Sequence, residues 1–446
     1  MAALAGLGEV LRSSVETRGL PGASLAVLHD GEVHEAAAGV LNLRTGVEVT
    51  TDSIFQIGSI TKVYTATLVM QLVEAGLVDL DAPVRTYLPA FRVLDDAASA
   101  SITIRQLLTH TSGFDGGDHF FDGGPADDNL ERYLESLAAL RQITPPGAYW
   151  SYNNAGFSVL GRVLEVVCGQ TYETILRERL FEPAGMEHSV TSAEEALLFR
   201  AAAGHQIGPD GLRLVKRWGL NRSAGPAGTI VASAADVIAF ARIHLEDGHA
   251  ILSPASVKAM QQEQVRFPGG EAGIGLGWMV GDVEGVRVVS HNGGTIGQAS
   301  FLITVPDRQF AIALLTNGPS GGLVWQDIAQ HVGTELGLPT RASLLPSPPE
   351  TPSTLDLSKY VGTYERRAVR TTMSLENDRL MMTMEYLDIE YDLTPPPPMP
   401  ITPVDEQTFV VVGPDGKSAM AVQFLEPDSD GRPQLFFAAR MATRVS

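Results

Sequence analysis

The chain has 446 residues, 44% of them hydrophobic, which predicts two or three folded domains and excludes global disorder. Asp and Glu number 52 against 32 Lys and Arg, so the net charge is −20, and nucleic acids and anionic membrane surfaces are not expected partners. The single cysteine, Cys168, cannot form an internal disulfide bond.

The first twenty residues predict an amphipathic helix and not a signal peptide. Glu9 and Glu16 interrupt the apolar residues, and no basic segment precedes a long apolar run. Because no run of about 18 apolar residues occurs, we expect no transmembrane helix. The simplest expected localisation is the cytoplasm.

Strands are predicted near both ends of the first 345 residues. An Asp30-Gly31 turn between apolar-rich segments predicts a hairpin over residues 23–37. Three later segments, 286–290, 301–305 and 310–315, predict strands of the same antiparallel sheet. Apolar residues at helical spacing predict the helices between them, over residues 59–74, 104–109, 130–140, 156–167, 171–180, 234–245 and 323–336.

A Pro-rich segment divides the chain. Residues 346–352 read Pro-Ser-Pro-Pro-Glu-Thr-Pro, a stiff linker, and beyond them the helical period is replaced by short alternating strands. We therefore predict a catalytic domain (1–345), a linker (346–356) and a small β domain (357–446). The predicted fold class is α+β: an antiparallel sheet flanked by helices, with a mostly helical subdomain, followed by an all-β barrel.

Ser59 and Lys62 form the strongest candidate site. Residues three apart share one helical face, so the Ser59 hydroxyl and the Lys62 amine can meet. A serine hydroxyl needs a base, and a lysine whose pKa is lowered by burial can act as one. Ser-x-x-Lys alone also fits a helix cap followed by a surface lysine.

Two further motifs add to this pair. Tyr152 and Asn154 follow a Pro-Pro-Gly turn, and a phenol beside a lysine can relay a proton. The Asn154 amide can hold Lys62 or a substrate carbonyl. His291-Asn292-Gly293-Gly294 follows the strand at 286–290, where the two glycines would allow close approach of a substrate backbone.

These three motifs, in this order, resemble those of the serine β-lactamase and penicillin-binding-protein superfamily. The similarity covers about residues 5–340 and is greatest to the branch of class C β-lactamases, family VIII esterases and D-aminopeptidases. The C-terminal part resembles the lipocalin-like domain appended to many such enzymes. Flanking segments support the resemblance: Phe55-Gln-Ile-Gly-Ser, Ile104-Arg-Gln-Leu-Leu-Thr-His-Thr-Ser-Gly and Ala224-Gly-Pro-Ala-Gly-Thr.

The resemblance implies specific roles. Ser59 would be the nucleophile, Lys62 and Tyr152 the general base and acid, and the N–H groups of Ser59 and Gly294 the oxyanion hole. His291 is a further expected catalytic residue, able to donate a hydrogen bond to Tyr152 or to a substrate carboxylate. It stands where many relatives have the lysine that binds a substrate carboxylate, and an imidazole is a weaker anchor. This departure makes an efficient β-lactamase a poor expectation and suits esterases, D-peptidases and peptidyl transferases.

Other residues allow two interpretations. Trp218 could line the substrate cleft or fill the core. Arg440 and Arg444 are surface charges unless the β domain caps the cleft. In that case one of them could bind a substrate carboxylate, and we predict that Arg444 does so.

Asn292 and Gly293 are further expected substrate contacts. The Asp- and Gly-rich residues 114–125 are expected to form a loop near the site and not a metal site; we expect no metal and no cofactor.

The leading functional hypothesis is hydrolysis of an ester or amide, with a small acyl or D-amino-acid-containing peptide substrate, through an acyl-enzyme at Ser59. The alternative is a penicillin-binding-protein-type thioesterase or acyltransferase that releases or macrocyclises a nonribosomal peptide, possibly bound to a carrier protein. A β domain that excludes water would favour transfer. A third hypothesis, a catalytically inactive sensor or binding protein, is opposed by the intact triad of Ser59, Lys62 and Tyr152.

Overall fold

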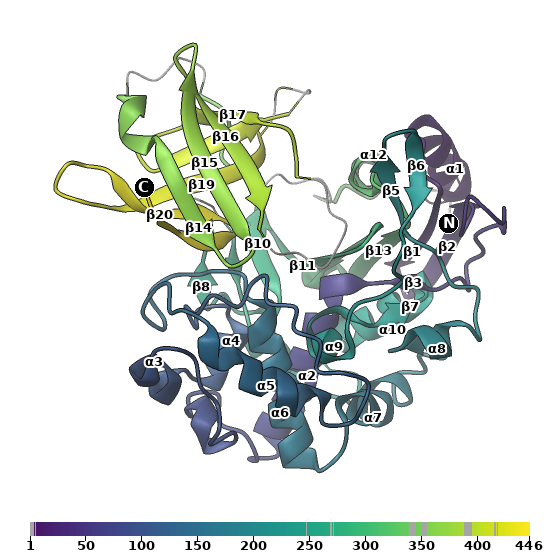
Figure 1. Cartoon of the computed structure of the whole chain (residues 1–446). Coiled ribbons are helices and arrows are strands. Elements are labelled where there is room, and N and C mark those ends of the chain that lie inside the picture. The colour runs from purple at the N-terminus through teal and green to yellow at the C-terminus, as the bar shows by residue number, and fades with distance from the viewer. Residues whose placement is uncertain are drawn as a thin grey trace.

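The computed structural model describes residues 4, 6–246, 248–267, 270, 272–338, 345–349, 355–387, 395–413, 416 and 418–446. Figure 1 shows a large α+β domain with a separate β-barrel standing over its helical part. The predicted fold class is therefore confirmed. Among the described residues, no helix combines the length and apolar character needed to cross a membrane. Part of the predicted linker lies outside the described residues.

An antiparallel eight-stranded sheet forms the centre of the large domain. The first hairpin pairs with strands from the end of the domain, with Ala23 opposite Thr316, as the sequence predicts. The strand order is β2-β1-β13-β12-β11-β10-β9-β8. The strands are β1 (Gly22–His29), β2 (Glu32–Gly39), β8 (Val265–Arg266), β9 (Gly273–Ile274), β10 (Met279–Val283), β11 (Val286–Thr295), β12 (Gln298–Val305) and β13 (Phe310–Thr316).

Helices cover both faces of this sheet. The first and last helices of the domain, α1 and α12, pack on one face, while α10 packs on the other; the buried α2 packs against α6 and α9. The longer helices are α1 (Leu7–Thr17), α2 (Thr61–Glu74), α5 (Asn129–Ser136), α6 (Asn154–Cys168), α10 (Ala234–Leu245), α11 (Pro254–Gln261) and α12 (Gly321–Leu336). Shorter helices are α3 (Asp96–Ser101), α4 (Ile104–Leu108), α7 (Tyr172–Leu176), α8 (Ala193–Ala196) and α9 (Gly225–Gly228). Short strand pairs join β3 (Phe55–Gln56) and β4 (Ser189–Val190) to β7 (Val231–Ala232), and β5 (His205–Gly208) to β6 (Gly211–Leu214).

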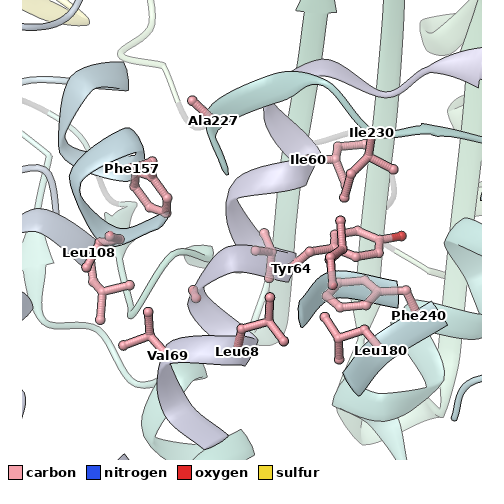
Figure 2. Close-up of a cluster of buried hydrophobic side chains, with 14 of the residues drawn as sticks. Ile60, Tyr64, Leu68, Val69, Leu108, Phe157, Leu180, Ala227, Ile230 and Phe240 are labelled. Atoms are coloured by element: carbon pink, nitrogen blue, oxygen red, sulfur yellow. The ribbon is translucent and has the colours of Figure 1, made fainter. Parts of the chain in front are cut away.

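Helix α2 is buried nearly all round, which is why it shows little amphipathic pattern. Tyr64 stacks on Phe240 of α10 with ring centroids 3.5 Å apart, and Figure 2 shows Leu68 and Val69 on the same helix with Phe157 of α6 to one side of it. A helix enclosed in this way is held rigidly, so the residues at its N-terminal end are fixed in position.

Two predicted boundaries differ from the structure. Ser59 does not open the helix: it lies in a 3₁₀ turn, Gly58–Ile60, and α2 starts at Thr61. The turn follows from Gly58, whose φ of +51° suits glycine. The His291 motif does not follow a strand that ends at Ser290 either, because β11 continues to Thr295 and His291 pairs with Leu302.

The C-terminal domain is a closed eight-stranded antiparallel barrel, as predicted. The Asn377-Asp378 turn joins two strands, with both residues at positive φ. Aromatic rings fill the interior: Tyr360, Tyr364, Phe409 and Phe424 are all buried there. The strands are β14 (Gly362–Arg366), β15 (Val369–Glu376), β16 (Arg379–Tyr386), β17 (Met399–Pro403), β18 (Thr408–Val412), β19 (Ser418–Pro427), β20 (Pro433–Ala438) and β21 (Arg440–Arg444).

The barrel docks on the large domain through an apolar cluster and a hairpin. Trp150 of the large domain packs against Phe437 of β20, with ring centroids 5.7 Å apart. At the tip of the β20–β21 hairpin, the Ala439 carbonyl accepts a hydrogen bond of 2.9 Å from the N–H of Tyr152. The N–H of Met441 donates to Ser151 Oγ at 3.0 Å. The hairpin is therefore bonded directly to the segment that carries Tyr152.

Candidate active site

Ser59 and Lys62 meet as the sequence predicts. Lys62 Nζ lies 3.1 Å from Ser59 Oγ and donates a second hydrogen bond of 2.6 Å to the Ala227 carbonyl. The Lys62 side chain is completely buried. Burial lowers the pKa of Lys62 well below its usual value, and the positive charge of Arg440 lowers it further. A neutral amine beside the serine hydroxyl can accept its proton.

Tyr152 comes from the loop before α6 and reaches the same point. Lys62 Nζ lies 5.0 Å from the centre of its ring, and the phenol is hydrogen-bonded to Ser59. Burial raises the Tyr152 pKa to about 12, although the bond to Ser59 and the charge of Arg440 act in the opposite direction. Burial outweighs both of these, so the phenol holds its proton at neutral pH.

His291 lies on β11 close to Tyr152, with ring centroids 6.5 Å apart. Its Nδ1 lies 2.7 Å from the Asn292 carbonyl, and its buried Nε2 has no hydrogen-bond partner. Burial, with the charge of Lys62 as a second cause, lowers the His291 pKa to about 3. The imidazole is therefore neutral at physiological pH and does not supply the cation that a lysine would supply at this position.

Glycines bring β11 and the Ser59 turn together. A Cβ atom added to Gly58 would lie 2.6 Å from the Gly294 nitrogen, and one added to Gly293 would lie 1.9 Å from the Ile57 carbonyl oxygen. Only glycine therefore fits at Gly58 and Gly293 without movement of the backbone. The contact holds the Ser59 and Gly294 segments side by side, the arrangement that an oxyanion hole made of their N–H groups requires. Asn292 is exposed beside this contact.

The Asn154 amide donates to the Gly117 carbonyl at 2.7 Å, whereas Lys62 Nζ bonds to Ser59 and to the Ala227 carbonyl. The Ala227 carbonyl takes the place that the sequence assigned to the amide. Fully buried His110 accepts a hydrogen bond of 2.9 Å from the Asn153 N–H, and its ring lies 4.4 Å from that of Tyr152. His110 has a φ of +55°, a backbone conformation that non-glycine residues rarely adopt.

The arginine that reaches the site is Arg440 and not Arg444. Arg440 Cζ lies 5.3 Å from the centre of the Tyr152 ring. Arg444 instead donates within the barrel, to the carbonyls of Val361 and Pro433 and to the hydroxyl of Tyr364. The two arginines lie four residues apart on one face of β21, about 13 Å apart along a strand, so the sequence pattern could not separate them.

Trp218 packs in a buried cluster at the edge of a cavity whose lining does not include Ser59, Lys62 or Tyr152, so a place in the substrate cleft stays a prediction. Its indole N–H donates to the Ala202 carbonyl at 2.8 Å, and its ring packs on a small buried cluster. It also lines a cavity of about 630 Å³ together with Gln56 and Thr229. Within the described segments, no three His, Cys, Asp or Glu side chains gather as a metal site; His119, in the Asp- and Gly-rich loop, bonds to Ser136.

Comparison with known proteins agrees with this geometry. The family model described as Beta-lactamase matches residues 7–332. The chain belongs to the β-lactamase family. Penicillin-binding protein 4 of Amycolatopsis lactamdurans is 44% identical to this β-lactamase-family protein over 358 residues, which cover 78% of the chain and 93% of that relative. The resemblance stated from the motifs is thus confirmed, and the protein is a member of a superfamily of serine hydrolases and acyltransferases.

Other relatives extend over both domains of this β-lactamase-family protein. The crystal structure of SurE with D-Leu has a TM-score of 0.77 and 28% identity, and covers 100% of both chains. The unguisins hydrolase ungD′ of Aspergillus campestris is 25% identical over 488 residues, 94% of this chain and 89% of that one. The barrel is therefore shared with full-length relatives and is not peculiar to this chain.

Proposed function

We propose that the protein is a serine acyltransferase that takes a peptidyl group with a D-configured C-terminal residue onto Ser59 and passes it preferentially to an amine. The observation that carries the proposal is the barrel hairpin, which bonds to the Tyr152 backbone and places Arg440 beside the Tyr152 ring. A cover over the reacting groups limits the access of water to the acyl-enzyme, and this favours an acceptor that the protein binds.

The proposed acylation follows from the protonation states. Ser59 Oγ attacks the acyl carbonyl while its proton passes to the neutral Lys62 amine. The N–H groups of Ser59 and Gly294 stabilise the oxyanion. Tyr152 donates its proton to the leaving alcohol, thiol or amine, and Lys62 returns a proton to Tyr152. The acceptor amine then attacks the ester carbonyl and gives a proton to the same pair; the ester C–O bond breaks, and the pair returns that proton to Ser59 Oγ.

Two findings support the choice of substrate. The relative with the same two domains was crystallised with D-Leu, which supports a D-configured residue in the acyl position. Arg440 offers a cation close to the reacting groups, where it can bind a carboxylate or carbonyl oxygen of the peptide. The neutral His291 cannot supply this charge.

The proposal can be tested with peptidyl thioesters of N-acetylcysteamine that differ only in the configuration of the last residue. We expect the D-ended peptide to acylate Ser59, seen as an adduct in intact-protein mass spectrometry, and to give more aminolysed or cyclised product than free acid. The L-ended peptide should react at least tenfold more slowly. Ser59→Ala should form no adduct, and equal turnover by this variant would show that the mechanism is wrong.

Hydrolysis is the second candidate, because the full-length fungal relative is named a hydrolase. The two functions share the acyl-enzyme and differ in the acceptor. If free acid remains the only product at every amine concentration, with an intact Ser59 adduct, the protein is a hydrolase and the transfer proposal fails.

A further inference from the structure

The position of Arg440 depends on residues outside the barrel. Its guanidinium Nε lies 3.6 Å from Asp118 Oδ1, in the loop of the large domain that the sequence marked as Asp- and Gly-rich. The other carboxylate oxygen of Asp118 pairs with Arg366 of β14. The Asp118 side chain is only 19% exposed, so water screens these ion pairs weakly.

The loop is also shaped to admit the arginine. A Cβ atom on Gly117 would lie 2.6 Å from Arg440 Cδ and 2.7 Å from its Nε, so the absence of a side chain there leaves the space that Arg440 occupies. The same residue accepts the Asn154 hydrogen bond through its carbonyl. Gly117 and Asp118 together thus provide a slot and a counter-charge for one barrel arginine.

We propose that Asp118 is a positioning residue that holds Arg440 beside Tyr152. The carboxylate then fixes the barrel arginine from the catalytic side, so the orientation of this cation depends on both domains. This role of Asp118 rests on the proposed function, in which Arg440 binds the peptide. The effect of Arg440 on the pKa of Lys62 can still be measured during acylation, without an acceptor amine.

The charged and titratable groups facing Arg440 come from several elements. Asp118 lies on the loop, Arg366 on β14, and Tyr386 on β16. Tyr152, Lys62 and His110 face it from the large domain. Arg440 contributes to the lowered Lys62 pKa, whereas Asp118 is not among the causes of that shift. If Asp118 acts by holding Arg440, its removal should therefore raise the apparent pKa of the acylating base.

The test is a double-mutant cycle on the pH profile of the acylation burst with a p-nitrophenyl ester, a readout that needs no amine acceptor. Asp118→Asn and Arg440→Gln should each raise the apparent pKa of the base by about half a unit, which lowers the acylation rate at pH 7 about threefold. The double variant should show no further shift. Arg366→Met is the matched control: it breaks the other ion pair of Asp118 and should leave the pKa of the base unchanged.

The proposal is overturned if Asp118→Asn leaves the pKa of the base unchanged, and also by either of two other results. If Asp118→Asn still shifts the apparent pKa of the base in the Arg440→Gln background, Asp118 acts by a direct charge effect or by a structural effect and not through Arg440. A shift in Arg366→Met equal to that in Asp118→Asn would indicate that the barrel undocks. If Asp118→Asn does not fold, Asp118→Glu replaces it: a base pKa within about 0.2 units of wild type supports positioning by charge, whereas the pKa of Arg440→Gln contradicts it. Absence of aminolysis with the expected pKa shifts would reject the transfer function and keep the role of Asp118.

Discussion

Burial decides the protonation of the residues around Ser59 more than their mutual charges do. The Lys62 pKa is lowered, Tyr152 retains its proton and His291 stays uncharged, and burial is the largest cause in each case. The sequence could identify these residues because their order and flanks are distinctive. It could not give their protonation states, since no pattern in the chain encodes how completely a side chain is enclosed.

Lys62→Arg tests the role of the neutral amine. Because an arginine stays charged, it cannot accept the Ser59 proton, and we expect the acylation rate to fall about 10³-fold. In the wild type, the rate should rise with pH through the lowered Lys62 pKa and level off above it. Burst kinetics between pH 5 and 10 measure both effects, with Lys62→Met as the uncharged control. An arginine variant that acylates at the wild-type rate would contradict the assignment of Lys62 as the base.

At the scale of elements, local patterns located most segments but not their ends. Helix α10 matches its predicted range, because Ser233 caps it and accepts a hydrogen bond from the Asp236 N–H. Strand β17 was not predicted, because prolines at 400 and 403 are unusual inside a strand. Strand β11 runs past its predicted end because Gly293 and Gly294 pair across to β12, a tertiary effect that outweighs the poor strand propensity of glycine.

Close packing of helices predicts opposite outcomes for two glycine-to-alanine changes. A Cβ atom on Gly161 of α6 would lie 2.0 Å from Pro226 Cγ on α9, so Gly161→Ala should destabilise the protein by about 2 kcal/mol despite the higher helix propensity of alanine. A Cβ atom on Gly322 of α12 would meet no neighbouring group within 4 Å, and Gly322→Ala should stabilise the protein by roughly 0.5 kcal/mol. Urea unfolding of both variants checks the pair; stabilisation by Gly161→Ala would show that the contact relaxes without cost.

At the scale of the whole molecule, the sequence predicted both domains but not their contact. Trp150, Phe437 and the hairpin tip come from segments almost 300 residues apart, and nothing in their local spacing shows that they meet. This contact decides which of the two arginines reaches the site. Because local spacing does not show the contact, the sequence could not distinguish Arg440 from Arg444.

Buried histidines make the stability of the whole molecule sensitive to acid. Burial lowers the pKa of His244 to about 3, from an ordinary value of 6.5. Because the folded pKa is depressed, the contribution is present above pH 6.5 and is lost as the pH falls toward 3. Between pH 7 and pH 5, His244 alone should account for about 2 kcal/mol of lost stability.

His244→Gln measures this contribution. Its side chain can keep polar contact with Thr67 or Trp278, which bond to the two ring nitrogens. Urea unfolding at pH 7 and pH 5 should show a smaller difference in the free energy of unfolding for this variant, by about 2 kcal/mol. The other buried groups titrate alike in both proteins, so an unchanged difference would mean that His244 is not a source of the acid sensitivity.

The hairpin contact also couples access to reactivity. Because the Ala439 carbonyl bonds to the backbone nitrogen of Tyr152 itself, a barrel that swings aside to admit a bulky peptide releases the amide of the residue that must donate the proton. A displaced barrel would leave the Tyr152 amide without this hydrogen bond and would carry Arg440 away from the Tyr152 ring, so the reacting groups would be complete only while the two domains are docked.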